Sequence, residues 1–248
     1  MAGGTPFQAL EQRRTFEQIL LQVEAAIIDG RLRPGDRLPA ERDLAQTLGV
    51  SRPSVREALR VLEMFGVIVA RRGTGPDAGS IVAASAERGL QKALLLHAGL
   101  LRIPAADLAE VRVLLDEQAA TTAAQRAEAG LIARLHEIID GMRVAQTIGE
   151  LSAADAEFHV ELALASGNAL LPALMEALCE TMRQLQAEAF ERLPDWQAER
   201  DLLAVEHDAI LASVESGDSA AAGIAMRDHV MRSYRRVMDP PRAPAWPR

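Results

Sequence analysis

The sequence predicts a mainly α-helical protein in two parts: three helices with a small β-hairpin, and then an all-α bundle of about seven helices. Hydrophobic residues make up 49% of the chain but aromatic residues only 3%, and Ala, Leu, Glu and Arg recur at helical spacings rather than alternating as in strands. The length of 248 residues is near the size at which single cores stop growing, about 250 to 300 residues. Two domains are therefore expected.

The N-terminal elements are predicted from apolar spacing and from turn residues. A first helix is expected to end at Gly30, and Pro34 with Gly35 forms a tight turn before a short second helix. Ser51 is a suitable N-cap for a third helix, whereas Ala40 offers the second helix no capping oxygen. Two β-branched segments then flank a stretch rich in Gly and Arg, which is typical of a hairpin wing. The expected helices are 8–29, 41–48 and 51–65, the strands 67–70 and 80–83, and the winged helix-turn-helix domain 8–83.

The rest of the chain shows helical periodicity that is interrupted by Gly, Pro and capping residues. The interruptions include Pro104, Gly130, Gly149, Gly167, Pro194 and Gly217. We expect an all-helical domain over 86–237 and disordered tails over 1–7 and 239–248. The seven expected helices are 86–99, 104–128, 130–146, 150–165, 169–191, 196–216 and 218–237.

Charge is distributed unevenly along the chain. The formal net charge is -8, which by itself argues against a nucleic-acid partner. Residues 31–75, however, hold 9 Arg against 5 Asp and Glu, a net charge of +4, and the acidic excess lies after residue 85. Contacts to phosphate require such a local basic patch, so the first part of the chain is expected to bind nucleic acid.

Membrane and disulfide-bonded secreted proteins are disfavoured by the sequence. No apolar run reaches the roughly 18 residues that a membrane span needs, and the first residues do not resemble a secretion signal. The single Cys179 cannot form an internal disulfide and has apolar neighbours, so we expect a buried core thiol. These observations favour a cytoplasmic protein with no membrane partner.

The third predicted helix has one apolar face and one cationic face. Its core-spaced residues are Val55, Ala58, Leu59 and Leu62. The opposite face carries Arg52, Ser54, Arg56 and Arg60. Arginine can contact guanine O6 and N7 in the major groove with two hydrogen bonds. A solvated charged face on an ordinary helical hairpin would show the same spacing, so the spacing alone leaves both interpretations open.

A longer motif around this helix resembles the N-terminal signature of the GntR family of transcription regulators. It includes Pro34-Gly35-Asp36, Leu38-Pro39, Glu41-Arg42 and, after Gly49-Val50, the run Ser51-Arg52-x-x-Val55-Arg56-Glu57-Ala58-Leu59. The resemblance implies a homodimer on double-stranded operator DNA, with DNA contacts at Arg42, Ser51, Arg52, Ser54, Arg56 and the wing residue Gly73. The chain departs from the signature at Ala40, where the family usually has Ser, and in a longer wing tip.

Three histidines and an aspartate form a candidate metal site. Asp155 and His159 are four residues apart, so both side chains leave one face of a helix and can share a metal ion. His207 and His229 lie on two later predicted helices. The alternative for each histidine taken alone is a hydrogen-bonded core or surface residue.

The same segments resemble the helical FCD-type ligand-binding domain of the FadR subfamily of GntR regulators. The resemblance covers about 86–237 and implies that Asp155, His159, His207 and His229 hold a divalent metal ion. One carboxylate and three imidazoles suit zinc, with nickel or manganese as alternatives.

Two further residues are candidates for binding an effector. Arg112 matches a family position that can face the ligand pocket, where a guanidinium would hold a carboxylate with two hydrogen bonds. A surface ion pair with Glu110 or Asp116, both within helical reach, is the alternative for Arg112. Asn168 could line the pocket or cap the turn after Gly167.

The resemblance implies a regulator rather than an enzyme. We expect a repressor whose operator affinity changes when a small organic acid binds beside the metal. One alternative keeps the regulator but makes the metal structural and the effector a larger acyl-type molecule. The other alternative, a metal-dependent hydrolase, lacks a zinc-hydrolase motif such as His-Glu-x-x-His.

Overall fold

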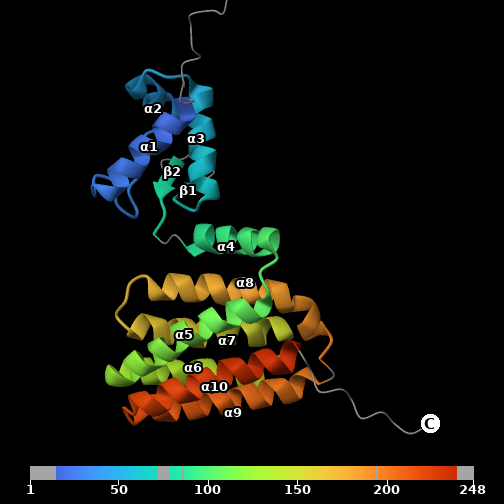
Figure 1. Ribbon diagram of the computed structural model, residues 1–248. Helices are drawn as coiled ribbons and strands as arrows, with labels where there is room; N and C mark the ends of the chain where they lie inside the picture. The colour runs from blue at the N-terminus through green and yellow to red at the C-terminus, as the bar shows by residue number, and fades with distance from the viewer. Residues whose placement is uncertain (1–14, 72–78, 85–86, 194, 239–248) are drawn as a thin grey trace, which may run out of the picture. The chain divides into compact units, whose positions relative to one another are not determined.

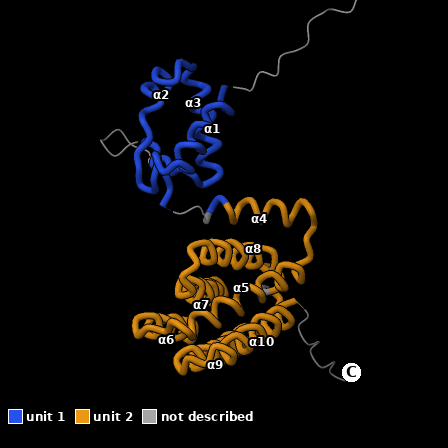
Figure 2. The backbone as a smooth tube through the Cα atoms, turned by 60° about the vertical axis from the view of Figure 1, so that its left-hand side comes forward, with its two compact units in different colours: residues 1–89 blue, residues 90–248 orange. Residues whose placement is uncertain are grey.

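The computed structural model describes residues 15–71, 79–84, 87–193 and 195–238. The chain divides into two compact units, residues 1–89 and 90–248 (Figure 2). Within the described residues it has ten helices and one two-stranded sheet, so the predicted fold class is confirmed. The expected tails, the start of the first helix and most of the hairpin loop, including Gly73, lie outside the described residues.

The first unit begins with three helices (Figure 1). These are α1 (Thr15–Ile28), α2 (Glu41–Leu48) and α3 (Arg52–Met64). Ser51 caps α3 as expected, because its Oγ accepts a hydrogen bond from the amide of Ser54, whereas Ala40 makes no side-chain cap on α2. Gly49 ends α2 with a φ of 65°, a left-handed conformation that favours glycine. The apolar face of α3 packs against α1 and α2, which leaves its polar face outward.

A β-hairpin follows α3. Its strands are β1 (Ile68–Arg71) and β2 (Gly79–Val82). They pair antiparallel with Ile68 opposite Val82, and both of these side chains are buried. β1 begins one residue later than expected, because the amide of Val67 still bonds to the carbonyl of Leu62 in the turn after α3, and β2 begins one residue earlier than expected.

The second unit is a bundle in which the seven expected helices are all present. Their bounds are α4 (Glu87–Leu101), α5 (Ala105–Gln125), α6 (Ala129–Val144), α7 (Ile148–Ala165), α8 (Leu171–Glu191), α9 (Trp196–Glu215) and α10 (Ser219–Met238). Helix α5 contacts α7, α8, α9 and α10, and so lies at the centre of the bundle (Figure 1). No helix among the described residues combines the length and hydropathy needed to cross a membrane.

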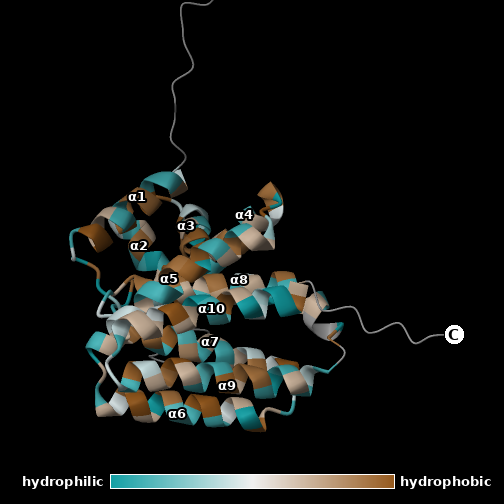
Figure 3. Cartoon of the chain, turned by 60° about the horizontal axis from the view of Figure 1, so that its bottom comes forward, coloured by the Kyte–Doolittle hydropathy of each residue, from teal (hydrophilic) through white to brown (hydrophobic). Residues whose placement is uncertain are grey.

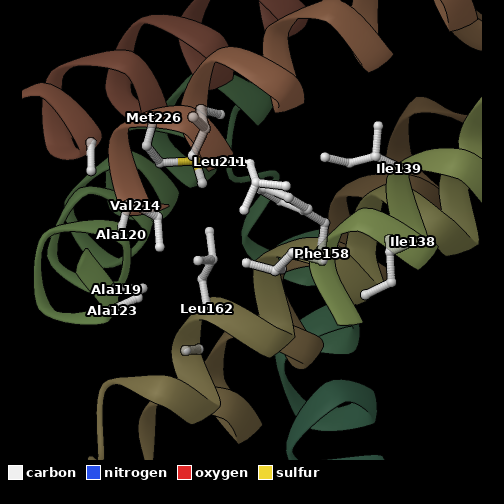
Figure 4. Close-up of a cluster of buried hydrophobic side chains, with 14 of the residues drawn as sticks. Ala119, Ala120, Ala123, Ile138, Ile139, Phe158, Leu162, Leu211, Val214 and Met226 are labelled. Carbon is white, nitrogen blue, oxygen red and sulfur yellow. The ribbon is translucent and has the colours of Figure 1, made fainter. Parts of the chain in front are cut away.

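The interior of the bundle combines small residues on α5 with larger aliphatic residues on its neighbours. Hydrophobic and hydrophilic residues alternate around the helices, as amphipathic packing requires (Figure 3). The buried small residues on α5 are Ala119, Ala120, Ala123 and Ala124. They allow α10 to approach so closely that a Cβ on Gly223 would lie 2.6 Å from Oγ1 of Thr121. Phe158 is the largest fully buried side chain and packs near Ile139 and Leu211 (Figure 4).

Candidate functional site

Four side chains from three helices of the second unit converge on one point. Asp155 and His159 extend from α7, His207 from α9 and His229 from α10. The distance from Oδ1 of Asp155 to Nε2 is 3.8 Å for His159, 3.4 Å for His207 and 4.0 Å for His229. One ligand atom from each residue lies within 4.8 Å of all the others. The sequence-predicted ligand set is therefore brought together in space.

The outer nitrogens of the three rings hold each histidine in one tautomer. Nδ1 lies 2.7 Å from Oδ1 of Asp116 in His159 and 2.9 Å from Oε2 of Glu206 in His229. In His207, Nδ1 lies 2.7 Å from a backbone carbonyl of its own helix. Because carboxylates and carbonyls accept hydrogen bonds, each Nδ1 donates, and in the neutral ring each Nε2 keeps a lone pair directed inward. Metal-bound histidines typically have this arrangement.

Two of the inward nitrogens have no hydrogen-bond partner among the described residues. They are Nε2 of His159 and Nε2 of His207, and both are buried. A buried polar atom without a partner costs about 1 to 3 kcal/mol, and each such atom in a native structure calls for an explanation such as a bound ion. The nitrogen-rich donor set and its unpartnered lone pairs fit a divalent metal ion.

Burial and nearby charge set the pKa values of the three rings. Burial, with a contribution from His229, lowers the pKa of His207 to about 3. Burial also lowers the pKa of His229, although Glu206 acts in the opposite direction. In His159, burial opposes protonation, but the charge of Asp116 and the hydrogen bonds to Asp116 and Asp155 together outweigh it and the pKa is raised. His207 and His229 are therefore neutral at pH 7, the form in which imidazole binds a metal.

An ion-pair network fixes the carboxylate behind His229. Glu206 is buried and accepts hydrogen bonds at 3.0 Å from both Arg232 and Arg236. Arg236 also donates to Glu199 at 2.9 Å. Burial would raise the pKa of Glu206, but hydrogen bonds from His229 and Arg236 lower it to about 2. Glu206 therefore remains ionised and oriented toward the ring.

Arg112 connects the ligand cluster to a small cavity. Its Nε donates to Oδ2 of Asp116 at 3.0 Å, and its Nη2 lies 3.6 Å from Oδ2 of Asp155. The side chains of Asp116 and Arg112 are 0% and 13% exposed, so the pair with Asp116 that was the alternative for Arg112 does form, but in the interior rather than at the surface. A cavity of about 40 Å³ adjoins Arg112 and Asp155, enclosed by residues of α5, α7, α8 and α10.

Asn168 lies apart from this group, whereas Cys179 belongs to it. Asn168 is exposed in the turn after Gly167, where its Oδ1 accepts a hydrogen bond from the amide of Leu170 at 3.0 Å. It is not among the described residues that line the cavity, and its geometry is that of a turn cap. Cys179 is buried as expected and lines the cavity. Burial raises the pKa of its thiol to about 12, which keeps it protonated.

The predicted DNA-contacting residues of the first unit lie at and before the start of α3. Those that are exposed are Arg42, Ser51, Arg52 and Arg56. Ser54 is half-buried, and its Oγ lies 2.8 Å from Oγ of Ser51. Gly73 is outside the described residues. The start of α3 therefore presents hydroxyl groups and guanidinium groups side by side, as contacts to phosphate and bases require.

One acidic residue on this surface was missed by sequence analysis. Glu41, in the first turn of α2, accepts hydrogen bonds from Arg56 at 3.1 Å and 2.8 Å. The hydrogen bond from Arg56 outweighs burial and lowers the pKa of Glu41. The two residues are fifteen positions apart, so only the packing of α2 against α3 shows that Glu41 orients this guanidinium.

Sequence analysis also did not identify the residues that orient the histidines. Asp116 and Glu206 bond to rings that are 43 and 23 positions away. A signal for Asp116 did exist, because it has helical spacing with the buried alanines of α5 and so places a carboxylate on an apolar face. For Glu206 no comparable signal exists. Its neighbour in sequence, His207, points toward the ligand cluster, so the sequence position of Glu206 does not indicate that Glu206 contacts another ring of the same cluster.

Both units match family models. The model of the FCD domain matches residues 107–232, which are 126 of the 248 residues. The model of "Bacterial regulatory proteins, gntR family" matches residues 15–76. The first match covers the four candidate metal ligands, and the second covers α1 to α3 and β1.

Similar proteins are transcription regulators rather than enzymes. The HTH-type transcriptional regulator LutR of Bacillus subtilis is 33% identical over 210 residues, which are 82% of this chain and 92% of LutR. The Exu regulon transcriptional regulator of Escherichia coli is 31% identical over 222 residues, 89% of this chain and 83% of that protein. The solved structure of Streptococcus agalactiae GntR has the same fold, with a TM-score of 0.62 at 23% identity over 89% of this chain and 99% of that one. The chain therefore belongs to the GntR family of DNA-binding transcription regulators and carries an FCD domain.

Proposed function

We propose that this regulator is a repressor whose operator affinity is controlled by a small carboxylate bound beside a divalent metal ion. The observation that carries the proposal is the convergence of three histidine Nε2 atoms on Oδ1 of Asp155. Two of these nitrogens are buried without a partner in the described part of the chain. Lone pairs that are directed inward and not used by hydrogen bonds are what a metal site offers to its ion.

The ion would be held by Asp155, His159, His207 and His229. Zinc suits this donor set, and nickel and manganese are the alternatives. When bound, a divalent ion supplies a Lewis-acidic centre that attracts a carboxylate oxygen. Arg112, at the wall of the adjoining cavity, would bind the second oxygen of the same carboxylate. Asn168 is outside this cavity, and we assign it to the turn.

The size and polarity of the cavity favour a small acid over a larger acyl-type effector. Pockets for drug-sized ligands measure about 300 to 1,000 Å³, whereas this cavity measures about 40 Å³. A hydrolase is also disfavoured. Glu206, next to a ligand in sequence, already accepts hydrogen bonds from His229, Arg232 and Arg236, so it is not free to act as a general base.

Operator contacts are assigned to the start of α3 and its surroundings. The residues are Arg42, Ser51, Arg52, Ser54, Arg56 and, beyond the described residues, Gly73. Placed in the major groove, the N-terminal end of α3 would direct its side chains at base edges. The exposed leucines of α4, at positions 96, 100 and 101, favour a homodimer that covers them. An effector would then change the spacing of two DNA-binding units, and a coupling of about 1 to 3 kcal/mol would change operator affinity 5- to 150-fold.

Elemental analysis of the purified full-length protein tests the metal. The wild type is compared with His159→Ala and with His136→Ala, a control at a surface histidine that is paired with Glu215. After supply of zinc, we expect close to one ion per chain in the wild type and in His136→Ala, and loss of the ion in His159→Ala. Equal metal content in His159→Ala and the control would contradict the assigned ligands.

A DNA-binding assay tests the control by an effector. Operator sequences are selected in vitro from random DNA, and their affinity is measured by fluorescence anisotropy with small carboxylic acids present. We expect at least one acid to weaken operator binding fivefold or more with the metal present and to have no effect after chelation. Acids that leave the affinity unchanged in both states would overturn the proposed function.

A further inference from the structure

Gln186 on α8 has a buried side-chain NH2 group, at the wall of the cavity, that makes no hydrogen bond among the described residues. Its side chain is 6% exposed, and its Nε2 donates to no acceptor among the described residues. It lines the cavity that also adjoins Arg112 and Asp155. Because a buried NH2 group that donates no hydrogen bond costs free energy, its presence here indicates that a ligand in the cavity supplies the missing acceptor.

The cavity has a charged end and a neutral end. The charged end is formed by Arg112 and Asp155, beside the ligand cluster. The neutral polar groups that line the rest are Ser152 of α7, Gln186 of α8, and Ser233 and Tyr234 of α10. These side chains can donate and accept hydrogen bonds but carry no charge at pH 7. The lining therefore suits a ligand with an anionic group at one end and an uncharged polar group at the other.

The charges around the cavity accommodate one carboxylate. A divalent ion together with Asp155 would leave one positive charge, because the imidazoles are neutral ligands. Arg112 is already balanced by Asp116. Of the other residues that line the cavity, only Arg183 is cationic, and it is 44% exposed and paired with Glu180. A second carboxylate at the neutral end would therefore lose its hydration without gaining a buried cation.

We propose that Gln186 determines effector specificity, and that the effector is a small monocarboxylic acid that also carries a neutral hydrogen-bonding group such as a hydroxyl or carbonyl. This inference rests on the proposed function, in which the carboxylate binds at the metal and Arg112. The amide of Gln186 donates a hydrogen bond to the second group. An unsubstituted aliphatic acid leaves the amide without a partner, and a dicarboxylate places an unbalanced charge beside it.

Isothermal titration calorimetry on the full-length, zinc-loaded protein tests this specificity. The probes have three carbons each: propanoate, its 2-hydroxy, 3-hydroxy and 2-oxo derivatives, and propanedioate. The variants are Gln186→Met, which keeps the side-chain length but removes the amide, and Gln186→Leu as a second apolar replacement. The control is Gln184→Leu, because Gln184 is exposed on the same helix and bonds to Glu180 instead. Zinc content and melting temperature are measured for each variant.

We expect at least one substituted monocarboxylate to bind the wild type and Gln184→Leu about tenfold or more tightly than propanoate, since a site built for a hydrogen bond rejects ligands that lack it. Either folded Gln186 variant should bind propanoate as the wild type does and lose most of that preference. A preference that survives in the Gln186 variants, equal binding of all acids, or tightest binding of propanedioate would overturn the inference while the proposed function stands. If no acid binds the zinc-loaded wild type, the proposed function itself fails.

Discussion

Arg236 is a single residue on which two carboxylates of the candidate metal centre depend. Its guanidinium contacts Glu199 and both oxygens of Glu206, and Glu206 in turn accepts the hydrogen bond from His229. Both carboxylates are less than a tenth exposed. Removal of this cation would leave buried Glu199 without its cationic partner and Glu206 with Arg232 as its remaining one among the described residues, which is unfavourable. Glu206 would then be held less firmly against the ring, by Arg232 alone.

Arg236→Met is therefore expected to weaken metal binding although Arg236 touches no ligand atom. Loss of an outer partner of a metal-bound histidine typically reduces metal affinity about 10- to 100-fold. The zinc dissociation constant is measured by competition with a chromogenic chelator. Arg235→Met, at an exposed position of the same helix, is the control. Equal zinc affinity of the two variants would show that Glu206 holds His229 without Arg236.

The lowered pKa of His207 predicts that the metal-free protein loses stability in acid. Its pKa is about 3 in the folded state, compared with about 6.5 in an unfolded chain. Between these values only the unfolded state binds the proton, so the free energy of unfolding falls as pH decreases, by about 1.4 kcal/mol per pH unit from this residue. The raised pKa of His159 acts in the opposite direction, because its protonation favours the folded state.

Urea unfolding of the metal-free protein at pH 7 and pH 5 checks this expectation. His207→Gln should be less sensitive to acid than the wild type, because glutamine does not titrate. His136→Gln, at the surface, should behave as the wild type. The interpretation fails if His207→Gln loses as much free energy of unfolding between the two pH values as the control does.

At the scale of elements, Glu41 joins α2 to α3 through Arg56. In Glu41→Gln, the guanidinium loses its charged partner, and the proposed DNA-contacting surface loses one negative charge. We expect binding to random DNA to strengthen a few fold, because phosphate is repelled less. Discrimination between operator and random DNA should fall by about tenfold, since a bidentate contact contributes about 1 to 3 kcal/mol when the side chain is held in place.

Fluorescence anisotropy with operator and random DNA measures both affinities of this variant. Glu63→Gln removes the same charge from an exposed position near the end of α3 and serves as the control. If Glu41→Gln and Glu63→Gln give the same operator-to-random ratio, Glu41 contributes only its charge and does not orient Arg56.

The contact between α5 and α10 tolerates no side chain at position 223. A Cβ there would lie 2.6 Å from Oγ1 of Thr121 and 3.3 Å from Cγ of Glu117. Gly223→Val should therefore separate the helices and lower the free energy of unfolding by about 1 to 3 kcal/mol. Because α10 carries His229, zinc affinity should fall as well.

Chemical denaturation and zinc titration of Gly223→Val are compared with those of Gly141→Val. Gly141 is also within a helix, but nothing lies within 4 Å of a Cβ at that position, so valine there should be close to neutral. Equal stability of the two variants would mean that α5 and α10 can separate without cost.

The helices were predictable because glycine, proline and capping residues mark their ends, but the end of α5 also involves a contact between distant residues. Helix α5 was expected to continue to residue 128 but ends at Gln125. The guanidinium of Arg126 donates to the carbonyl of Ser166 at 2.6 Å, a contact 40 positions away that no local pattern contains. The start of β1 shifted by one residue for a local reason instead, since the turn after α3 includes Val67, whose amide bonds to the carbonyl of Leu62.

The candidate metal ligands were predictable from the spacing of Asp155 and His159 and from the family resemblance. The surroundings of the ligands were not. Asp116 was considered only as a possible surface partner of Arg112 and is fully buried against His159, because burial depends on which helix covers a given face. Gln186 gave no signal at all, since a glutamine on a helix is usually exposed.

At the scale of the whole molecule, a metal ion would connect three helices of one unit only. The ligands come from α7, α9 and α10 of the second unit, while the first unit has its own core. Two unfolding transitions are therefore expected. Zinc that binds the folded second unit stabilises that unit by about 4 kcal/mol when the free zinc concentration is about a thousand times the dissociation constant. Chelation should therefore lower the melting temperature of the second unit only.

Differential scanning calorimetry with zinc and with a chelator measures both transitions. The transition of the helix-turn-helix unit is the internal control, since it contains none of the four ligands. In His159→Ala, the second unit should unfold at the temperature of the metal-free protein both with zinc and with the chelator. A shift of both transitions, or of neither, would contradict a metal bound only within the second unit.

Burial of the three histidine rings also sets how an ion would leave. The rings are at most 1% exposed, whereas Asp155 is 22% exposed and lines the cavity. The cavity is therefore the route to solvent on the Asp155 side, and an effector seated in it would close that route. A chain that has bound its effector would retain the ion when zinc becomes scarce, and a chain without effector would lose it. The metal content of the regulator would then depend on whether its effector was present when zinc became scarce.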